Sequence, residues 1–297
     1  MKGTKKIVSL IVALAIFAGM ALGSSSDTGE TKPISGGESE ATENAAVNEK
    51  TTIEQQVLVD RDGLKITAME FVEDSIWGEG IKVLLENTSQ KDLGVNCKAV
   101  IVNDYMISDL FSSTIAAGKK ANETIHLSSS GLEAAGITNI GKIELYFHVY
   151  DSDTYDGIFD ADPVTIQTSA FESMDSQAEN TGNVLFEKDG IKIVGKYVEE
   201  DSFWGTAVLL YIENATDKNL TFSCEDMSIN GFMVDPVFYA EVYAGKKAVE
   251  EITIFSTDLE ENNISAIEEL EVKFRVYNTE SYDTVVETDP ITINVAQ

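Results

Sequence analysis

The sequence contains few residues of the kinds that build most catalytic and metal sites. Only two of its 297 residues are histidine, and only two are cysteine. Cys97 and Cys224 occupy equivalent positions in two halves of the chain that align with each other, so neither half can form an internal disulfide. Both lie in mixed apolar sequence, which favours buried free thiols. Each half must therefore be stabilised by core packing, which about 110 residues can support.

Basic residues are also scarce. Lysine and arginine together number 21, against 51 aspartates and glutamates, which gives a formal net charge of −30. Nucleic acid and anionic membrane surfaces repel such a chain, so the composition excludes both as partners. Cations and basic proteins remain compatible with it. The acidity alone also serves to keep a protein soluble.

Sequence patterns that accompany catalysis are missing. The chain has no Gly-x-Ser-x-Gly, no His-Glu-x-x-His, no glycine-rich phosphate loop and no Cys-x-x-Cys. Its two histidines, His126 and His148, align with Thr253 and Arg275 in the other half, so a histidine-based site would be confined to one half. The sequence therefore predicts a protein that is not an enzyme.

What the chain does have is a duplication. Residues 57–166 (the first repeat) and 184–293 (the second repeat) align without a gap at a constant offset, 190 − 63 = 127. The matched motifs are Asp-Gly, Asp-Ser-x-Trp-Gly, Glu-Asn, Ala-Gly-Lys-Lys-Ala, Val-Tyr and Asp-Pro-x-Thr-Ile. A period of more than a hundred residues is that of a domain rather than of a solenoid unit. We therefore expect two similar domains, 57–168 and 184–297, joined by a polar linker at 169–183.

Apolar residues in each repeat follow the period of β-strands. At 143–149 and 270–276 they alternate strictly with polar residues, which indicates half-buried antiparallel strands. Asp62-Gly63 and its counterpart at 189–190 predict tight hairpin turns. About seven or eight short strands per repeat, without an amphipathic helix of any length, predict an all-β fold of two tandem immunoglobulin-like β-sandwich domains. A small closed barrel is the alternative.

The N-terminus has the layout of a secretory signal peptide at 1–23. Lysines precede an apolar run at 7–22, and small residues precede Ser24. The run is shorter than the ~20 residues of a typical spanning helix, which favours a cleaved signal over a retained anchor. Membrane contact is expected only through this segment, if it is uncleaved. Residues 24–56 lack aromatic residues and predict a disordered acidic linker. We therefore expect a secreted or cell-envelope protein.

The signal segment, the acidic linker and the repeated motifs resemble those of a group of exported proteins. These come from Gram-positive, Clostridia-type bacteria and carry tandem immunoglobulin-like domains of unknown function. The resemblance departs from bacterial lipoprotein signals at Ser24, which stands where the lipid-bearing cysteine would be. It covers both repeats and implies the fold and an extracytoplasmic location. It implies no activity and no catalytic residues.

An acidic loop at 151–162 is the candidate metal site. Asp151, Asp153 and Asp156 are closely spaced and separated by small residues, as oxygen ligands of Ca²⁺ are. Their spacing does not match the EF-hand pattern, and the second repeat has Asn278 in place of Asp151. A solvated acidic loop without a metal is the alternative. No cofactor is expected, and calcium is the one that the sequence leaves open.

Aromatic residues near these loops form the candidate ligand-binding site. They are Trp77, Tyr150, Tyr155, Trp204, Tyr277 and Tyr282. On the surface they could stack on a sugar ring or anchor a protein partner, although the tryptophans could equally fill the gap between two sheets. The paired lysines at 119–120 and 246–247 predict either an anion-binding turn or charges that keep edge strands from pairing with other chains.

Together these features predict a non-catalytic binding or adhesion module at the cell surface, whose partner is a protein or a glycan. Three alternatives remain open at this point. The first is a calcium-dependent surface module that uses the loop 151–162. The second is a plain structural spacer, since duplication lengthens a stalk as readily as it multiplies sites. The third and most distant is a glycan-active enzyme, which would need a pair of carboxylates.

Overall fold

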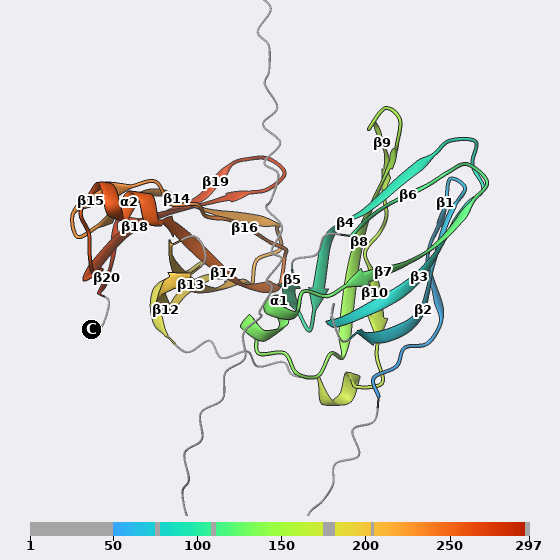
Figure 1. Cartoon of the computed structure of the whole chain (residues 1–297), viewed down its shortest axis with the longest axis horizontal. Coiled ribbons are helices and arrows are strands. Elements are labelled where there is room, and N and C mark those ends of the chain that lie inside the picture. The colour runs from blue at the N-terminus through green and yellow to red at the C-terminus, as the bar shows by residue number, and fades with distance from the viewer. Residues whose placement is uncertain (1–49, 75–77, 108–110, 175–181, 203–204, 295–297) are drawn as a thin grey trace, which may run out of the picture. The chain divides into compact units, whose positions relative to one another are not determined.

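Figure 1 shows the computed structural model of the chain, which describes residues 50–74, 78–107, 111–174, 182–202 and 205–294. The expected signal peptide and residues 24–49 of the expected linker lie outside these residues. Residues 49–297 form one compact unit, which contains both hydrophobic cores. Among the described residues, no helix is long and apolar enough to cross a membrane.

The first repeat is built from two antiparallel sets of strands. One is a four-stranded sheet in the order β1-β2-β3-β7, and the other contains β10-β8-β4-β5, with β6 on β4 and β9 on β8. The strands are β1 (Gln56–Arg61), β2 (Leu64–Asp74), β3 (Gly78–Asn87), β4 (Leu93–Val102), β5 (Tyr105–Ile107), β6 (Ser112–Ile115), β7 (Lys120–His126), β8 (Lys142–Asp151), β9 (Gly157–Asp160) and β10 (Val164–Gln167). The helical elements are α1 (Ser129–Ala134) and the 3-10 turn η1 (Phe171–Ser173).

The second repeat reproduces this arrangement strand for strand. Its first set is β17-β13-β12-β11, and its second set is β15-β14-β18-β19, with β16 on β14 and β20 on β18. The elements are β11 (Asn183–Lys188), β12 (Ile191–Ser202), β13 (Gly205–Asn214), β14 (Leu220–Ile229), β15 (Phe232–Val234), β16 (Tyr239–Val242), β17 (Lys246–Phe255), α2 (Ser256–Glu261), β18 (Glu269–Asn278), β19 (Thr284–Glu287) and β20 (Ile291–Asn294).

The alternation in the sequence decides which face of each strand is buried. In β8, Ile143, Leu145, Phe147 and Val149 point into the core, and the residues between them are only partly covered. The core of the first repeat draws buried residues from both sets of strands, as does that of the second. The predicted all-β sandwich fold is thus confirmed, with the sheets built largely from hairpins.

The Asp-Gly pairs form the predicted tight turns. Asp62 and Gly63 have φ angles of 51° and 84°, and Asp189 and Gly190 have 52° and 82°. Both central residues of each turn are therefore in the left-handed region, as a two-residue hairpin with the right-handed strand twist requires. These turns fix the register of β1 on β2 and of β11 on β12.

Two short strands in each repeat were not predicted. β6 and β9 in the first repeat, with β16 and β19 in the second, pair at the margins of their sheets. Each has only four residues, too few to display a clear period of two in the sequence.

The two repeats share a sheet, which the sequence did not predict. β5 of the first repeat pairs in parallel with β17 of the second, with Tyr105 opposite Lys247. A ten-stranded sheet therefore contains strands of both repeats (Figure 1). The lysine pair at 246–247 lies at this pairing, so in the second repeat it does not stand on an unpaired edge strand.

The Glu-Asn motif supplies a buried polar anchor to each repeat. Asn214 is fully buried, and its side-chain amide donates to the carbonyls of Lys218 and Val242 at 2.8 Å each. Its Oδ1 accepts hydrogen bonds from the backbone N–H and the hydroxyl of Thr216 at 3.0 and 2.6 Å. Asn87 makes the corresponding bonds in the first repeat. The motif therefore ties the end of one sheet to loops that lead into the other.

Candidate functional site

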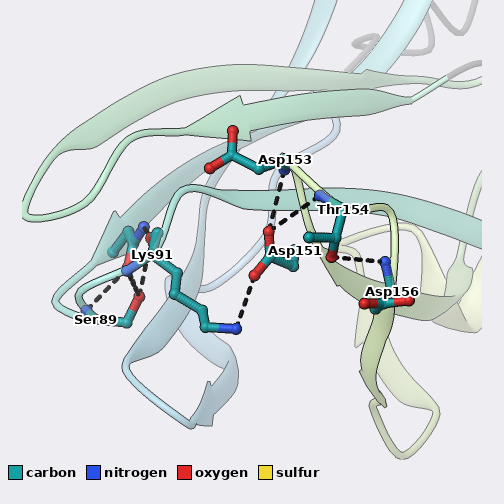
Figure 2. Close-up of polar contacts among 7 residues, drawn as sticks. Ser89, Lys91, Asp151, Asp153, Thr154 and Asp156 are labelled. Carbon is teal, nitrogen blue, oxygen red and sulfur yellow. Dashed lines mark hydrogen bonds and ion pairs between the residues drawn. The ribbon is translucent and has the colours of Figure 1, made fainter.

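The acidic loop between β8 and β9 is ordered by one of its own carboxylates. Oδ1 of Asp151 accepts hydrogen bonds from the backbone N–H groups of Asp153 and Thr154 at 3.1 and 3.3 Å, while Oδ2 lies 2.8 Å from Nζ of Lys91 (Figure 2). The hydrogen bond from Lys91 is the largest cause that lowers the pKa of Asp151, followed by the bond from the Asp153 amide. Asp151 is therefore engaged on both oxygens by the protein itself.

The other two predicted metal ligands do not join Asp151. Figure 2 shows the carboxylate of Asp153 turned away from that of Asp151, and Asp156 lies on the far side of the turn. Within the described residues, no three histidine, cysteine, aspartate or glutamate side chains are grouped closely enough to hold a metal ion. The structure thus places the three carboxylates on one loop without bringing them to a common point.

The second repeat builds the same loop with an uncharged residue. Oδ1 of Asn278 accepts from the N–H groups of Glu280 and Ser281 at 2.9 and 2.8 Å, which are the bonds that Asp151 makes in the first repeat. Its backbone N–H also donates to the carbonyl of Asp283, as that of Asp151 does to Asp156. An amide oxygen suffices for this turn, so its geometry explains the residue without a cation.

We therefore expect calcium to leave the stability of the protein unchanged. A ligand that binds the native state raises the melting midpoint according to its concentration over its dissociation constant, and the loop offers Ca²⁺ no converging set of ligands. The test compares thermal melts of residues 49–297 in EDTA and in millimolar Ca²⁺. A rise in the midpoint that Asp153→Ala removes would contradict this expectation.

Stacked aromatic rings lie beside the loop in the first repeat. His148 and Tyr150 are stacked with ring centroids 5.9 Å apart, and Tyr150 and Tyr155 are stacked at 6.0 Å with planes 16° apart. We call His148, Tyr150 and Tyr155 the first tyrosine ladder. Tyr155 is its outer end and is 78% exposed. One face of a flat aromatic ring is therefore presented to solvent.

The second repeat has an equivalent ladder, formed by Arg275, Tyr277 and Tyr282. Tyr277 and Tyr282 are stacked with centroids 6.3 Å apart and planes 24° apart. The guanidinium of Arg275 lies 5.5 Å from the centre of the Tyr277 ring, in the place that His148 takes in the first ladder. Tyr282 is 73% exposed. The four tyrosines predicted as site residues therefore form two matched pairs, one in each repeat.

Strand period and turn geometry together create each ladder. His148 and Tyr150 are two residues apart on β8, so both lie on its outer face. The closed loop then returns Tyr155 to that face, with its N–H bonded to the carbonyl of Asp151 at 2.8 Å. Beneath the first ladder, Gly94 leaves room for the Tyr150 ring, because a Cβ at that position would lie 2.2 Å from the ring.

The outer tyrosines are held in an unusual backbone conformation. Tyr155 and Tyr282 have φ angles of 61° and 60°, in the left-handed region that glycine and asparagine adopt at lower cost. A bulky residue in this region costs about 1–3 kcal/mol, and such strain occurs preferentially at functional sites. Both repeats retain the tyrosine in spite of this cost.

Ion pairs support the inner end of each ladder. Asp160 accepts from Nδ1 of His148 at 2.6 Å and from Nζ of Lys98 at 3.0 Å, and the bond with His148 is the largest cause that lowers the pKa of Asp160. In the second repeat Arg275 lies 3.5 Å from a carboxylate oxygen of Glu225. The sequence indicated for His148 only that a histidine-based site would be confined to one repeat. A signal for the role of His148 in the ladder was present in the sequence. Positions 148 and 150, like 275 and 277, are two residues apart on one strand and so share its outer face.

The remaining residues singled out in the sequence are the two tryptophans and the two cysteines. Trp77 and Trp204 lie outside the described residues. Burial raises the pKa of the Cys224 thiol to about 12, whereas a reactive cysteine needs a lowered pKa. The ladders themselves offer stacking and hydrogen bonding.

Comparison with known proteins identifies no family for this chain. No protein-family model matches it. No curated protein matches it either. Among solved structures, it is similar to the YadV chaperone, with a TM-score of 0.26 and 11% identity over 78% of this chain and 100% of that one. It is also similar to the Salmonella enterica SafA pilin in complex with the SafB chaperone (TM-score 0.24, 11% identity, 80% and 98% covered). A protein of unknown function from Porphyromonas gingivalis W83 gives a TM-score of 0.20, with 11% identity and 83% and 97% covered.

Proposed function

We propose that the chain is a non-catalytic binding module of the cell exterior, in which each repeat presents one tyrosine ladder to a glycan. The observation that carries this proposal is the retention of an exposed tyrosine in left-handed backbone at both outer ends. Glycine or asparagine would form the same turn with less strain, so stability does not account for the tyrosine. Recognition of a ligand does.

A glycan suits the shape of the ladder. The outer ring is flat and open on one face, and its inner neighbour holds it in a fixed orientation by stacking. Carboxylates next to the outer rings, among them Asp156 and Asp283, can accept hydrogen bonds from sugar hydroxyls. Two equivalent ladders on one chain also allow two sugars of one polymer to be bound together, which strengthens weak single contacts.

A basic protein is the second candidate partner. Tyrosine is enriched among the residues that dominate protein interfaces, and the acidic loops beside the ladders would attract lysine and arginine. The two candidates differ in their dependence on salt. Glycan stacking is largely insensitive to ionic strength, whereas attraction between an acidic surface and a basic protein weakens as salt screens it.

The test replaces both outer tyrosines by asparagine, which tolerates the left-handed backbone. The double variant Tyr155→Asn with Tyr282→Asn is expected to fold as the wild type does and to lose retention on isolated cell-wall polysaccharide. Each single variant should lose most of the avidity, because one ladder remains. Retention can be measured by affinity electrophoresis or by sedimentation with insoluble cell walls.

Val57 supplies a matched control on the other sheet of the first repeat. It is exposed and apolar, and it lies in β1, away from the β8–β9 loop. Val57→Asn should bind as the wild type does. If the double tyrosine variant is retained as strongly as the wild type, the ladders are not the binding site and the spacer alternative gains. Loss of retention in 0.5 M salt, an arbitrary high value well above physiological ionic strength, would favour the protein partner.

A further inference from the structure

The junction between the repeats joins two different surfaces, and each repeat also carries the equivalent of the surface that its neighbour contributes. Within the junction, the face formed by β4, β5 and β8 of the first repeat contacts β13, β17 and the turn before β17 in the second. Because the repeats are equivalent, the second repeat has its own version of the first face, and the first repeat has its own version of the second. We call the edge at β15 (Phe232–Val234) the free β15 edge, and the edge at β7 (Lys120–His126) with the preceding Lys119 the free β7 edge.

The internal junction shows what such an edge binds. The backbone N–H of Lys247 donates to the carbonyl of Asp104 at 3.0 Å, which starts the pairing of β17 with β5. Nζ of Lys246 lies 2.7 Å from a carboxylate oxygen of Asp104 and 2.5 Å from one of Glu144. The lysine pair therefore contributes both a strand and a charge to a partly buried acidic site.

Aromatic packing completes this junction. Tyr105 lies 6.5 Å from Tyr211 and is 1% exposed, and Tyr146 meets Tyr243 edge to face at 4.8 Å. Nζ of Lys247 lies 5.5 Å from the centre of the Tyr105 ring. An edge strand that is covered in this way hides its large side chain completely.

The free β15 edge presents part of these features uncovered, namely the large apolar side chains of the edge strand and one of the two carboxylates. β15 ends its sheet within the described residues, and Phe232 and Met233, which correspond to Tyr105 and Met106, are 48% and 65% exposed. Glu271 corresponds to Glu144 and is also exposed. Glu269 stands where the first repeat has Lys142, and Gly231 stands where it has Asp104, so the carboxylates that remain for a lysine at this edge are those of Glu269 and Glu271.

The free β7 edge carries the complementary charge. β7 ends the sheet β1-β2-β3-β7 within the described residues. It begins within the same Gly-Lys-Lys-Ala sequence, which in the second repeat contains Lys247, the residue of β17 that pairs with β5. Lys119, the counterpart of Lys246, is exposed and makes no ion pair among the described residues. The first residues of this edge strand are therefore basic, in a chain whose net charge is −30.

We propose that copies of this chain associate head to tail, with the β7 edge of one copy on the β15 edge of the next and Lys119 beside Glu271. The contact repeats the internal junction between molecules. It is heterologous, since two different surfaces meet, so it leaves a free edge at each end and extends into linear chains. At this contact Lys273 and Ala116 stand where the internal junction has the Tyr146–Tyr243 pair. The contact between copies is therefore weaker than the internal junction and more dependent on charge.

Sedimentation velocity of residues 49–297 tests the proposal. At physiological salt, which screens the general repulsion between acidic chains beyond ~8 Å, the wild type is expected to form dimers and longer species as its concentration rises. Lys119→Glu and Glu271→Lys should each remain monomeric, because each places like charges together. An equimolar mixture of the two variants should associate again, since every contact in an alternating chain is then complementary.

Lys188→Glu provides a control with the same change of charge at an exposed position outside both edges. It should associate as the wild type does, and unchanged thermal melts of all variants show that the fold is intact. A wild type that stays monomeric at every concentration overturns the proposal. The proposal is also overturned if Lys119→Glu and Glu271→Lys associate as strongly as Lys188→Glu does. It is overturned as well if the equimolar mixture of the two edge variants stays monomeric.

Discussion

Asn214→Ala is expected to lower the free energy of unfolding of the second repeat by about 3–5 kcal/mol. The substitution removes a fully buried amide and leaves the carbonyls of Lys218 and Val242 without the donor that satisfies them. It also removes the acceptor for the N–H and hydroxyl of Thr216. Each buried polar group that loses its partner costs about 1–3 kcal/mol, which makes this loss large beside ordinary surface changes.

Urea denaturation followed by circular dichroism measures the effect. Asn122→Ala is the matched control, because Asn122 is an exposed asparagine on the edge strand β7 and its truncation should change the midpoint little. Asn87→Ala should reproduce the loss in the first repeat. A midpoint for Asn214→Ala that equals that of the control would show that these hydrogen bonds contribute no net stability.

Glu250→Gln is expected to stabilise the protein above neutral pH and to have little effect in acid. Burial, followed by the neighbouring charge of Glu251, raises the pKa of Glu250 from 4.5 to about 7. Between these two pH values the folded chain holds a proton that the unfolded chain has released. The contribution of this group to the free energy of unfolding therefore falls as pH rises through this window, by about 3 kcal/mol at most. Above the window its contribution is constant.

The difference in unfolding free energy between Glu250→Gln and the wild type isolates this group from the other carboxylates. It should be near zero at pH 4, grow through pH 5 to 7 and level off above about pH 8. In the first repeat the equivalent Glu123 accepts a hydrogen bond from Ser113 at 3.0 Å, whereas the second repeat has Ala240 in place of that serine. Ala240→Ser should therefore reduce the difference. A difference that is flat from pH 4 to 8 would contradict the raised pKa.

Sequence patterns of short range predicted the fold well. The alternation at Ile143, Leu145 and Phe147 is a local property of the strand, and the Asp62-Gly63 turn depends on two residues alone. The duplication was also found from the sequence, because the constant offset between the repeats reveals it directly. The shared sheet could not be found in this way, because pairing of β5 with β17 joins residues far apart in the chain, and nothing in either strand alone specifies the other.

The candidate site was predicted in composition but not in arrangement. Tyr150, Tyr155 and their counterparts were recognised because they recur, yet stacking depends on the left-handed backbone at Tyr155, a conformation that tyrosine by itself disfavours. Asp151 was assigned to calcium because carboxylates and small residues also characterise metal loops. Its actual bonds, to the amides of Asp153 and Thr154, are those of a common turn.

The ten-stranded sheet changes what the segment 169–183 does for the molecule. With β5 paired to β17 and Lys246 bonded to Asp104 and Glu144, the two repeats are held by non-covalent contacts of their own. The polypeptide between them then serves mainly to keep the repeats at a high local concentration. A protease that cut this segment would leave two fragments that complement each other, so the molecule could be nicked without being separated.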